Sequence, residues 1–286
     1  MTADPALLAL LVLAGAVGGV LVGLIGVGGG IVYAPALLIV LAAGGVTDPA
    51  LTPIVLGTSL LCVGVASASG AAAQVRRGAV HVRAALVSGA VASVAVMAVG
   101  RLVATQPWYD SRAFAGVFAS VLLLVAAQMV RPRSATASAA AAETEAGRAE
   151  PRADTPRLVG AGLLAGALSA LAGVGGGTVL VPVFNGPIRL PLRTAIGTSA
   201  AAIVLVAASG VATYAVLGWG APGRPAGAVG YVSLVHAAAL VLPAIVTARW
   251  GVALVHRVPV ARVRVGFAVF AAAMAVRLLW EAFGPA

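Results

Sequence analysis

The chain has 286 residues, of which 61% are hydrophobic and 9% are charged, and its mean hydropathy is +1.08. Soluble globular proteins are charged at about a quarter of their residues, so this composition excludes a surface that faces water on all sides. It predicts an all-α, polytopic integral membrane protein. The net charge of +10 comes from arginines between apolar runs, where positive charge orients a membrane protein and does not imply nucleic acid.

The residues that common cofactor and redox sites require are missing or scattered. The sequence contains no lysine, which excludes a P-loop lysine and a Schiff base. Its single cysteine, Cys62, excludes an internal disulfide and a CxxC motif. The 3 histidines and 8 carboxylates are too dispersed for an evident metal cluster. We therefore expect no cofactor, no bound metal and no catalytic residue.

Uncharged runs divide the chain into eight hydrophobic segments in two sets of four, and a membrane helix needs about 20 such residues. These segments are 5–47, 49–75, 84–100, 113–130, 158–188, 194–223, 225–248 and 265–276. The first four form an N-terminal repeat, 1–131, and the others a C-terminal repeat, 157–286. Between them, 132–156 holds small residues, prolines and four carboxylates, which predicts a polar, disordered linker.

Two motifs recur in the same order in both repeats. The stretch 14–35 matches 161–182 without a gap, at twelve of 22 positions. The triplet Gly-Thr-Ser at 57–59 recurs at 197–199. Internal repeats of this kind are typical of secondary transporters, in which the substrate site lies between the repeats.

The first motif contains a glycine cluster, Gly-Val-Gly-Gly-Gly, at 26–30 and again at 173–177. Each glycine costs a helix about 1 kcal/mol relative to alanine, so we expect both helices to break there, inside the membrane. A break frees backbone N–H groups, and the positive N-terminus of the next helix favours a small anion. The candidate substrate-binding glycines are Gly26, Gly28, Gly29, Gly30, Gly173, Gly175, Gly176 and Gly177.

Close helix packing is the alternative role for these glycines, because a missing side chain lets two membrane helices touch. Packing alone is what we expect of the glycines spaced along the helix before each cluster: Gly15, Gly19, Gly23, Gly162 and Gly166. A dinucleotide-binding loop is excluded, because the flanking apolar runs are of membrane length.

The hydroxyls of the two triplets are candidate donors to the same anion: Thr58, Ser59, Thr198 and Ser199. Hydrogen bonding back to their own helix is the alternative. From helix propensity alone, alanine at either threonine is not expected to harm folding. No carboxylate lies inside the apolar runs, which disfavours a carrier of Mg²⁺ or Ca²⁺.

Two further residues are candidates for the transport pathway. Cys62 lies one turn after Ser59 and offers a soft contact for sulfur, although a buried thiol more often only packs. His236 is the only ionisable ring well inside an apolar run, and its alternative role is a neutral hydrogen bond to a neighbouring helix.

The duplicated glycine cluster, the proline that follows it and the Gly-Thr-Ser triplet resemble the TauE/SafE sulfite exporter family. The resemblance covers about 14–130 and 160–282. It implies a multi-pass protein of the cell inner membrane that exports or imports small sulfur-containing anions such as sulfite, sulfoacetate or related organosulfonates. The resemblance supports the two glycine clusters and the two triplets as site residues, and it does not extend to Cys62 or His236.

The sequence therefore predicts a secondary anion transporter that works by alternating access around a site between the repeats. An anion channel and a non-transporting accessory subunit remain as alternatives, and a homodimer is left open. A membrane-embedded enzyme, with Ser59 and His236 as nucleophile and base, is the least supported class because no carboxylate stands ready to orient the histidine.

Membrane orientation is left open by the sequence. If the chain crosses eight times, Arg76, Arg77 and Arg83 share one face with the linker arginines. Four others would then lie on the opposite face: Arg249, Arg257, Arg262 and Arg264. This near-balance weakens the positive-inside rule and is also expected if the broken segments do not all span. Whether the repeats are parallel or inverted is left open.

Overall fold

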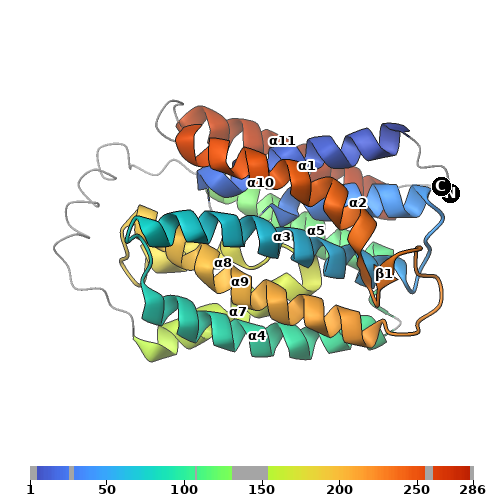
Figure 1. The fold of residues 1–286 in the computed structure, drawn as a ribbon, viewed down its shortest axis with the longest axis horizontal. Coiled ribbons are helices and arrows are strands. Elements are labelled where there is room, and N and C mark those ends of the chain that lie inside the picture. The colour runs from blue at the N-terminus through green and yellow to red at the C-terminus, as the bar shows by residue number, and fades with distance from the viewer. Residues whose placement is uncertain (1–4, 26–28, 107, 131–153, 255–259, 284–286) are drawn as a thin grey trace.

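The computed structural model describes residues 5–25, 29–106, 108–130, 154–254 and 260–283, which form ten helices and one short strand pair (Figure 1). The helices are α1 (Pro5–Ile25), α2 (Gly30–Ala43), α3 (Leu51–Arg76), α4 (Val82–Thr105), α5 (Ser111–Val130), α7 (Thr155–Ala172), α8 (Gly177–Asn185), α9 (Leu192–Leu217), α10 (Leu234–Leu254) and α11 (Val260–Phe283). The strands β1 (Ala228–Val229) and β2 (Val232–Ser233) pair antiparallel just before α10, a small exception to the all-α prediction.

The helices confirm an all-α, polytopic membrane protein. Five of them are long and apolar enough to cross a membrane, namely α1, α3, α4, α7 and α9. Shorter apolar helices occur within α2, α5, α10 and α11. Eight complete crossings stay a prediction. Most of the predicted linker, 131–153, lies outside the described residues.

Both glycine clusters interrupt helices, as the sequence predicts. In the first repeat α1 ends at Ile25 and α2 begins at Gly30, with 26–28 outside the described residues. In the second repeat α7 ends at Ala172, and three of the next four residues are glycines with φ of 65°, 81° and 77°. Side chains disfavour this left-handed region, which explains why glycine stands at these positions.

Each interrupted segment turns back on itself. A Cβ on Gly18 of α1 would overlap the ring of Tyr33 in α2, so the two helices form a hairpin. In the second repeat, the Arg157 guanidinium at the start of α7 donates at 3.1 Å to the carbonyl of Pro187, which follows α8. The chain therefore leaves each hairpin at the end where it entered.

The first helix of each repeat packs against the fourth helix of the other repeat. A Cβ on Gly15 of α1 would stand 2.8 Å from Pro243 of α10, and one on Gly162 of α7 would stand 2.6 Å from the carbonyl oxygen of Ser88 in α4. Gly162 follows Gly15 by 147 residues, the offset of the sequence match. The packing role is confirmed for the spaced glycines, since Gly19, Gly23 and Gly166 also meet the partner helix.

These contacts divide most of the helices into two bundles. The first bundle contains α1, α2, α3 and α10, and the second contains α7, α8, α9 and α4. Each bundle thus takes three helices from one repeat and one from the other. Helices α3 and α9 join the bundles, while α5 and α11 pack on each other.

Equivalent helices of the two repeats run in opposite directions. Gly57 of α3 meets Tyr214 of α9, and Gly64 meets Ala207, so α3 and α9 are antiparallel. In Figure 1 the start of α1 and the end of α11 lie at the same end of the molecule.

Most arginines among the described residues lie at one end, where α3 and α10 end and α4, α7, α9 and α11 begin. This arginine-rich end carries Arg76, Arg77, Arg83, Arg157, Arg189, Arg193, Arg249, Arg262 and Arg264. The opposite end carries Arg101, Arg112, Arg224 and Arg277. If the chain crossed eight times, Arg249, Arg262 and Arg264 would lie opposite Arg76, whereas the structure places their helix ends at the same end of the molecule as Arg76. Arg257 lies outside the described residues.

Replacing Gly166 with alanine tests the contact between α7 and α4. The new Cβ would stand 2.7 Å from the Cβ of Ala95 and 2.8 Å from the Cα of Ala92. Because such overpacking costs roughly 1–3 kcal/mol, we expect a lower thermal unfolding midpoint in detergent. Gly160→Ala, on the same helix, is the matched control, since nothing lies within 4 Å of its new Cβ. Equal midpoints in the two variants would contradict this packing.

Candidate functional site

The two helix interruptions meet at the middle of α3. A Cβ on Gly30, the first residue of α2, would stand 2.6 Å from the Cα of Val174. Val63, which is midway along α3 and fully buried, lies against both Gly30 and Gly175. The structure thus brings the two glycine clusters together where the first bundle contacts the second.

Two helix N-termini begin at this junction without a side-chain cap. Gly29 precedes α2 and Gly176 precedes α8, and within the described residues neither N-terminus has a side-chain capping hydrogen bond. The first N–H groups of a helix lack intrahelical partners, and the helix dipole makes that end positive. Backbone donors and positive potential therefore converge on the junction.

Buried hydroxyls without a hydrogen-bond partner cluster around the interruptions. Tyr33 lies in the first turn of α2, Thr178 in the first turn of α8 and Ser169 in the last turn of α7. Ser199 of the second triplet and Ser67 of α3 also lack partners. Buried polar atoms are paired in the great majority of cases, so unpaired hydroxyls at one place indicate room for water or a polar ligand.

The threonines of the triplets hold each bundle together. The Ser233 N–H, at the start of α10, donates to Thr58 Oγ1 at 2.9 Å, and the His81 N–H, at the start of α4, donates to Thr198 Oγ1 at 2.9 Å. Both bonds join segments of different repeats within one bundle. Neither bond is the alternative expected from the sequence, a hydrogen bond back to the threonine's own helix.

The serines of the triplets face the contact between the bundles. The Ser59 hydroxyl donates at 2.8 Å to the carbonyl of Gly173, which belongs to the other bundle. Ser199 is fully buried and its hydroxyl has no partner among the described residues. Thr58 and Thr198 use their hydroxyls as acceptors and Ser59 uses its hydroxyl as a donor, so of the four only Ser199 forms no hydrogen bond within the described residues.

The two pathway candidates lie beside the start of α10. The Cys62 thiol is fully buried and lies 3.9 Å from the carbonyl oxygen of Ala237. His236 Nδ1 lies 2.7 Å from the Ser233 hydroxyl. Ser59 therefore bonds to Gly173 and not to His236, so the pair expected of an enzyme is not assembled. No group of three metal-ligating side chains occurs in the described part of the chain.

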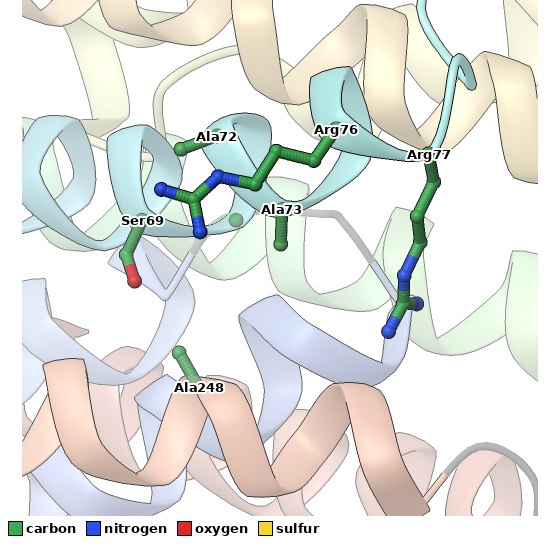
Figure 2. Close-up of a pocket in the computed structure, with 7 residues that line it drawn as sticks. Ser69, Ala72, Ala73, Arg76, Arg77 and Ala248 are labelled. Carbon is green, nitrogen blue, oxygen red and sulfur yellow. The ribbon is translucent and has the colours of Figure 1, made fainter.

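Sequence considerations overlooked a cavity at the arginine-rich end. It has a volume of about 490 Å³ and lies between α3 and α10 (Figure 2). Its lining residues are Ser69, Gly70, Ala72, Ala73, Arg76, Arg77 and Ala248. The signal in the sequence is a run of small residues that ends in two consecutive arginines.

Known proteins resemble this chain over most of its length. A family model described as Sulfite exporter TauE/SafE matches residues 11–278. A "Probable membrane transporter protein" of Haemophilus influenzae is 28% identical over 271 residues, covering 94% of this chain and 97% of that protein. A protein of the same name from Xylella fastidiosa is 30% identical over 192 residues, 65% of each chain. No solved structure matches the chain.

The hydrogen bonds reverse the expectation that alanine at the triplet threonines leaves folding unharmed. Thr198→Ala removes the acceptor of the His81 N–H, and an unpaired buried donor costs roughly 1–3 kcal/mol. We expect a lower thermal unfolding midpoint and recovery with Thr198→Ser. Thr213→Ala, on the same helix, is the control because its hydroxyl bonds only to Ser209 of that helix. A shift no larger than that of the control would contradict the structural role.

Proposed function

We propose that this chain, which belongs to the TauE/SafE sulfite exporter family, is a secondary transporter of small sulfur-containing anions. The general class, a multi-pass membrane transporter, follows from the family and from the names of its relatives. The proposal adds the substrate, a sulfur oxyanion or organosulfonate, the site at the junction of the glycine clusters, and the inner membrane of the cell.

The observation that carries the substrate class is the convergence of two uncapped helix N-termini and several unpaired hydroxyls on one buried junction. An anion would accept hydrogen bonds from both kinds of donor. The carboxylates among the described residues lie near helix ends, at Asp48, Asp110, Asp154 and Glu281. None lies beside the junction to repel an anion or to bind a divalent cation.

The moving parts in this proposal are the two bundles. The bonds of Thr58 and Thr198 lie within a bundle, whereas the bond from Ser59 to Gly173 crosses from one bundle to the other. Rocking of the bundles about α3 and α9 would break the crossing bond and keep the internal ones. The antiparallel α3 and α9 support inverted repeats, the arrangement in which such motion exposes a central site to each side in turn.

The distribution of arginines supports one orientation. Positive charge is enriched on the cytoplasmic side of membrane proteins. We therefore assign the arginine-rich end to the cytoplasm, which leaves the start of α1 and the end of α11 on the opposite side.

Anion binding to the purified protein tests this function. We expect sulfite or sulfoacetate, at about 100 times its dissociation constant, to stabilise the wild-type protein by roughly 2.7 kcal/mol, whereas Mg²⁺ should not. The measurement is the thermal unfolding midpoint across a concentration series of each anion. A protein that no sulfur-containing anion stabilises would argue against the substrate class.

Ser199→Ala tests the site itself. The hydroxyl has no internal partner, so we expect unchanged stability without ligand. A hydrogen bond to a charged group contributes roughly 1.5–3 kcal/mol, and its loss should weaken anion binding about tenfold or more. Ser88→Ala is the control, because that buried hydroxyl bonds to Ala84 of its own helix. Wild-type affinity in Ser199→Ala would remove this residue from the site.

A further inference from the structure

The arginine-lined cavity opens along the C-terminal half of α3. Ser69 lies seven residues before Arg76, which corresponds to roughly 10 Å along a helix. In Figure 2 the Arg76 side chain runs back along α3 towards Ser69, while the Arg77 side chain points away from that helix. The small residues of α3, together with Ala248 of α10, leave the space between the two helices empty.

The two guanidinium groups are not used by the fold. Both side chains are exposed, and neither contacts a carboxylate or another hydrogen-bond acceptor among the described residues. Arginine binds oxyanions well because its planar fork of N–H groups matches two oxygens at once. Two unpaired guanidinium groups at one opening therefore constitute an anion-attracting surface.

The second repeat supplies an internal comparison, because its equivalent position is filled and uncharged. A Cβ on Gly210, the counterpart of Gly70, would stand 2.6 Å from Leu60 and 3.4 Å from Val96. A Cβ on Gly70 would meet nothing within 4 Å. The counterpart of Leu60 is Ala200. The His81 and Ser233 N–H groups bond to equivalent threonines and lie 152 residues apart, so the counterpart of Val96 is Ala248.

The same comparison holds for the charges. The counterparts of Arg76 and Arg77 are Val216 and Leu217. The fold thus accommodates this position without a cavity and without arginines. Both features are therefore particular to one end of the protein and are not required for packing.

The cavity lies at the level of the unpaired serines. The register of α3 against α9, in which Gly64 opposes Ala207, places Ser199 opposite Ala72 of the cavity wall. Ser67 lies closer to the junction, one helical turn from Val63 on α3. It is buried, and its hydroxyl has no hydrogen-bond partner among the described residues. Two buried hydroxyls without a partner among the described residues, those of Ser199 and Ser67, thus lie at levels of α3 between the arginines and the meeting point of the glycine clusters.

We propose that this cavity is the entrance through which anions reach the central site from the arginine-rich end, and that Arg76 and Arg77 capture them there. The ligand class is a small oxyanion or sulfonate. This inference rests on the proposed function for the destination of the anion. Because the counterpart position beside Gly210 is filled and carries Val216 and Leu217 in place of the two arginines, capture is one-sided, and the apparent affinity for substrate should be higher from the arginine-rich end.

Thiol labelling tests the entrance without relying on transport. In Ser69→Cys, the introduced thiol would react with a methanethiosulfonate that carries either a sulfonate or a trimethylammonium group. The native thiol of Cys62 is fully buried, so its background should be low. We expect Arg76→Gln/Arg77→Gln to lower the ratio of sulfonate to ammonium labelling rates about tenfold, because local positive potential concentrates anions by such factors.

The controls separate the cavity from the overall charge of the protein. Arg76→Lys/Arg77→Lys should preserve most of the preference for the sulfonate reagent over the ammonium reagent. Arg101→Gln, at the end of α4 away from the arginine-rich end, should leave this preference unchanged. Ser209→Cys, at the counterpart of Ser69, should show a ratio that does not depend on Arg76 and Arg77. High salt should lower the ratio at Ser69→Cys without any arginine variant, because it screens exposed charge.

The outcomes distinguish the two proposals. An unchanged ratio after removal of both arginines, in a protein that still binds sulfite, would overturn the entrance and leave the transport function standing. The expected loss of the ratio supports the entrance. If wild-type proteoliposomes showed that ratio and moved no sulfite or sulfoacetate, the proposed function would fail while the anion-attracting cavity remained.

Discussion

Lipid cannot hydrogen-bond the polar backbone that an interrupted helix exposes, and the remaining architecture follows from this constraint. Two interruptions lie deep in the protein, and each must be enclosed by other helices. The chain achieves this enclosure by exchange, because α1 lies on α10 and α7 lies on α4, so that each repeat covers the hairpin of the other. The glycines at Gly15 and Gly162 permit the backbones to approach closely enough for this packing. Without these contacts the N-termini of α2 and α8 would face hydrocarbon.

The packing of each repeat on a helix of the other also determines which groups are structural and which are available to a ligand. The threonine hydroxyls of the two triplets accept hydrogen bonds from backbone N–H groups at the starts of α10 and α4, and these bonds hold each bundle together. The serines one position later face the other bundle, where Ser59 is bonded and Ser199 is not. This difference between equivalent serines accompanies a second asymmetry, the cavity beside Gly70 and the filled space beside Gly210. Two repeats of similar fold thus present different surfaces at the two ends of the molecule.

The sequence predicts the features that depend on local physics. Clustered glycines cannot sustain a helix, so the interruptions at 26–30 and 173–177 follow from composition alone, and the spacing of Gly15 and Gly19 indicates close packing. The partners of Thr58 and Thr198 could not be predicted, because they lie in the other repeat and depend on the direction of α10 and α4. The hairpins could not be predicted either, because after a helix break the chain can continue in the same direction or turn back. The arginine-lined cavity depends on substitutions such as Leu60 to Ala200 between repeats, which gain meaning only once the register of α3 and α9 is known.

The central claim is that the two glycine interruptions together form an anion site between the bundles. The most direct measurement is a crystal structure with selenite, an analogue of sulfite whose selenium is located by anomalous scattering. We expect a peak at the junction of Gly30 and Gly175, within hydrogen-bond distance of the N-termini of α2 and α8 or of the Ser199 hydroxyl. A molecule whose anomalous peaks lie only on its outer surface, with a dry, fully packed junction at Val63, would contradict it.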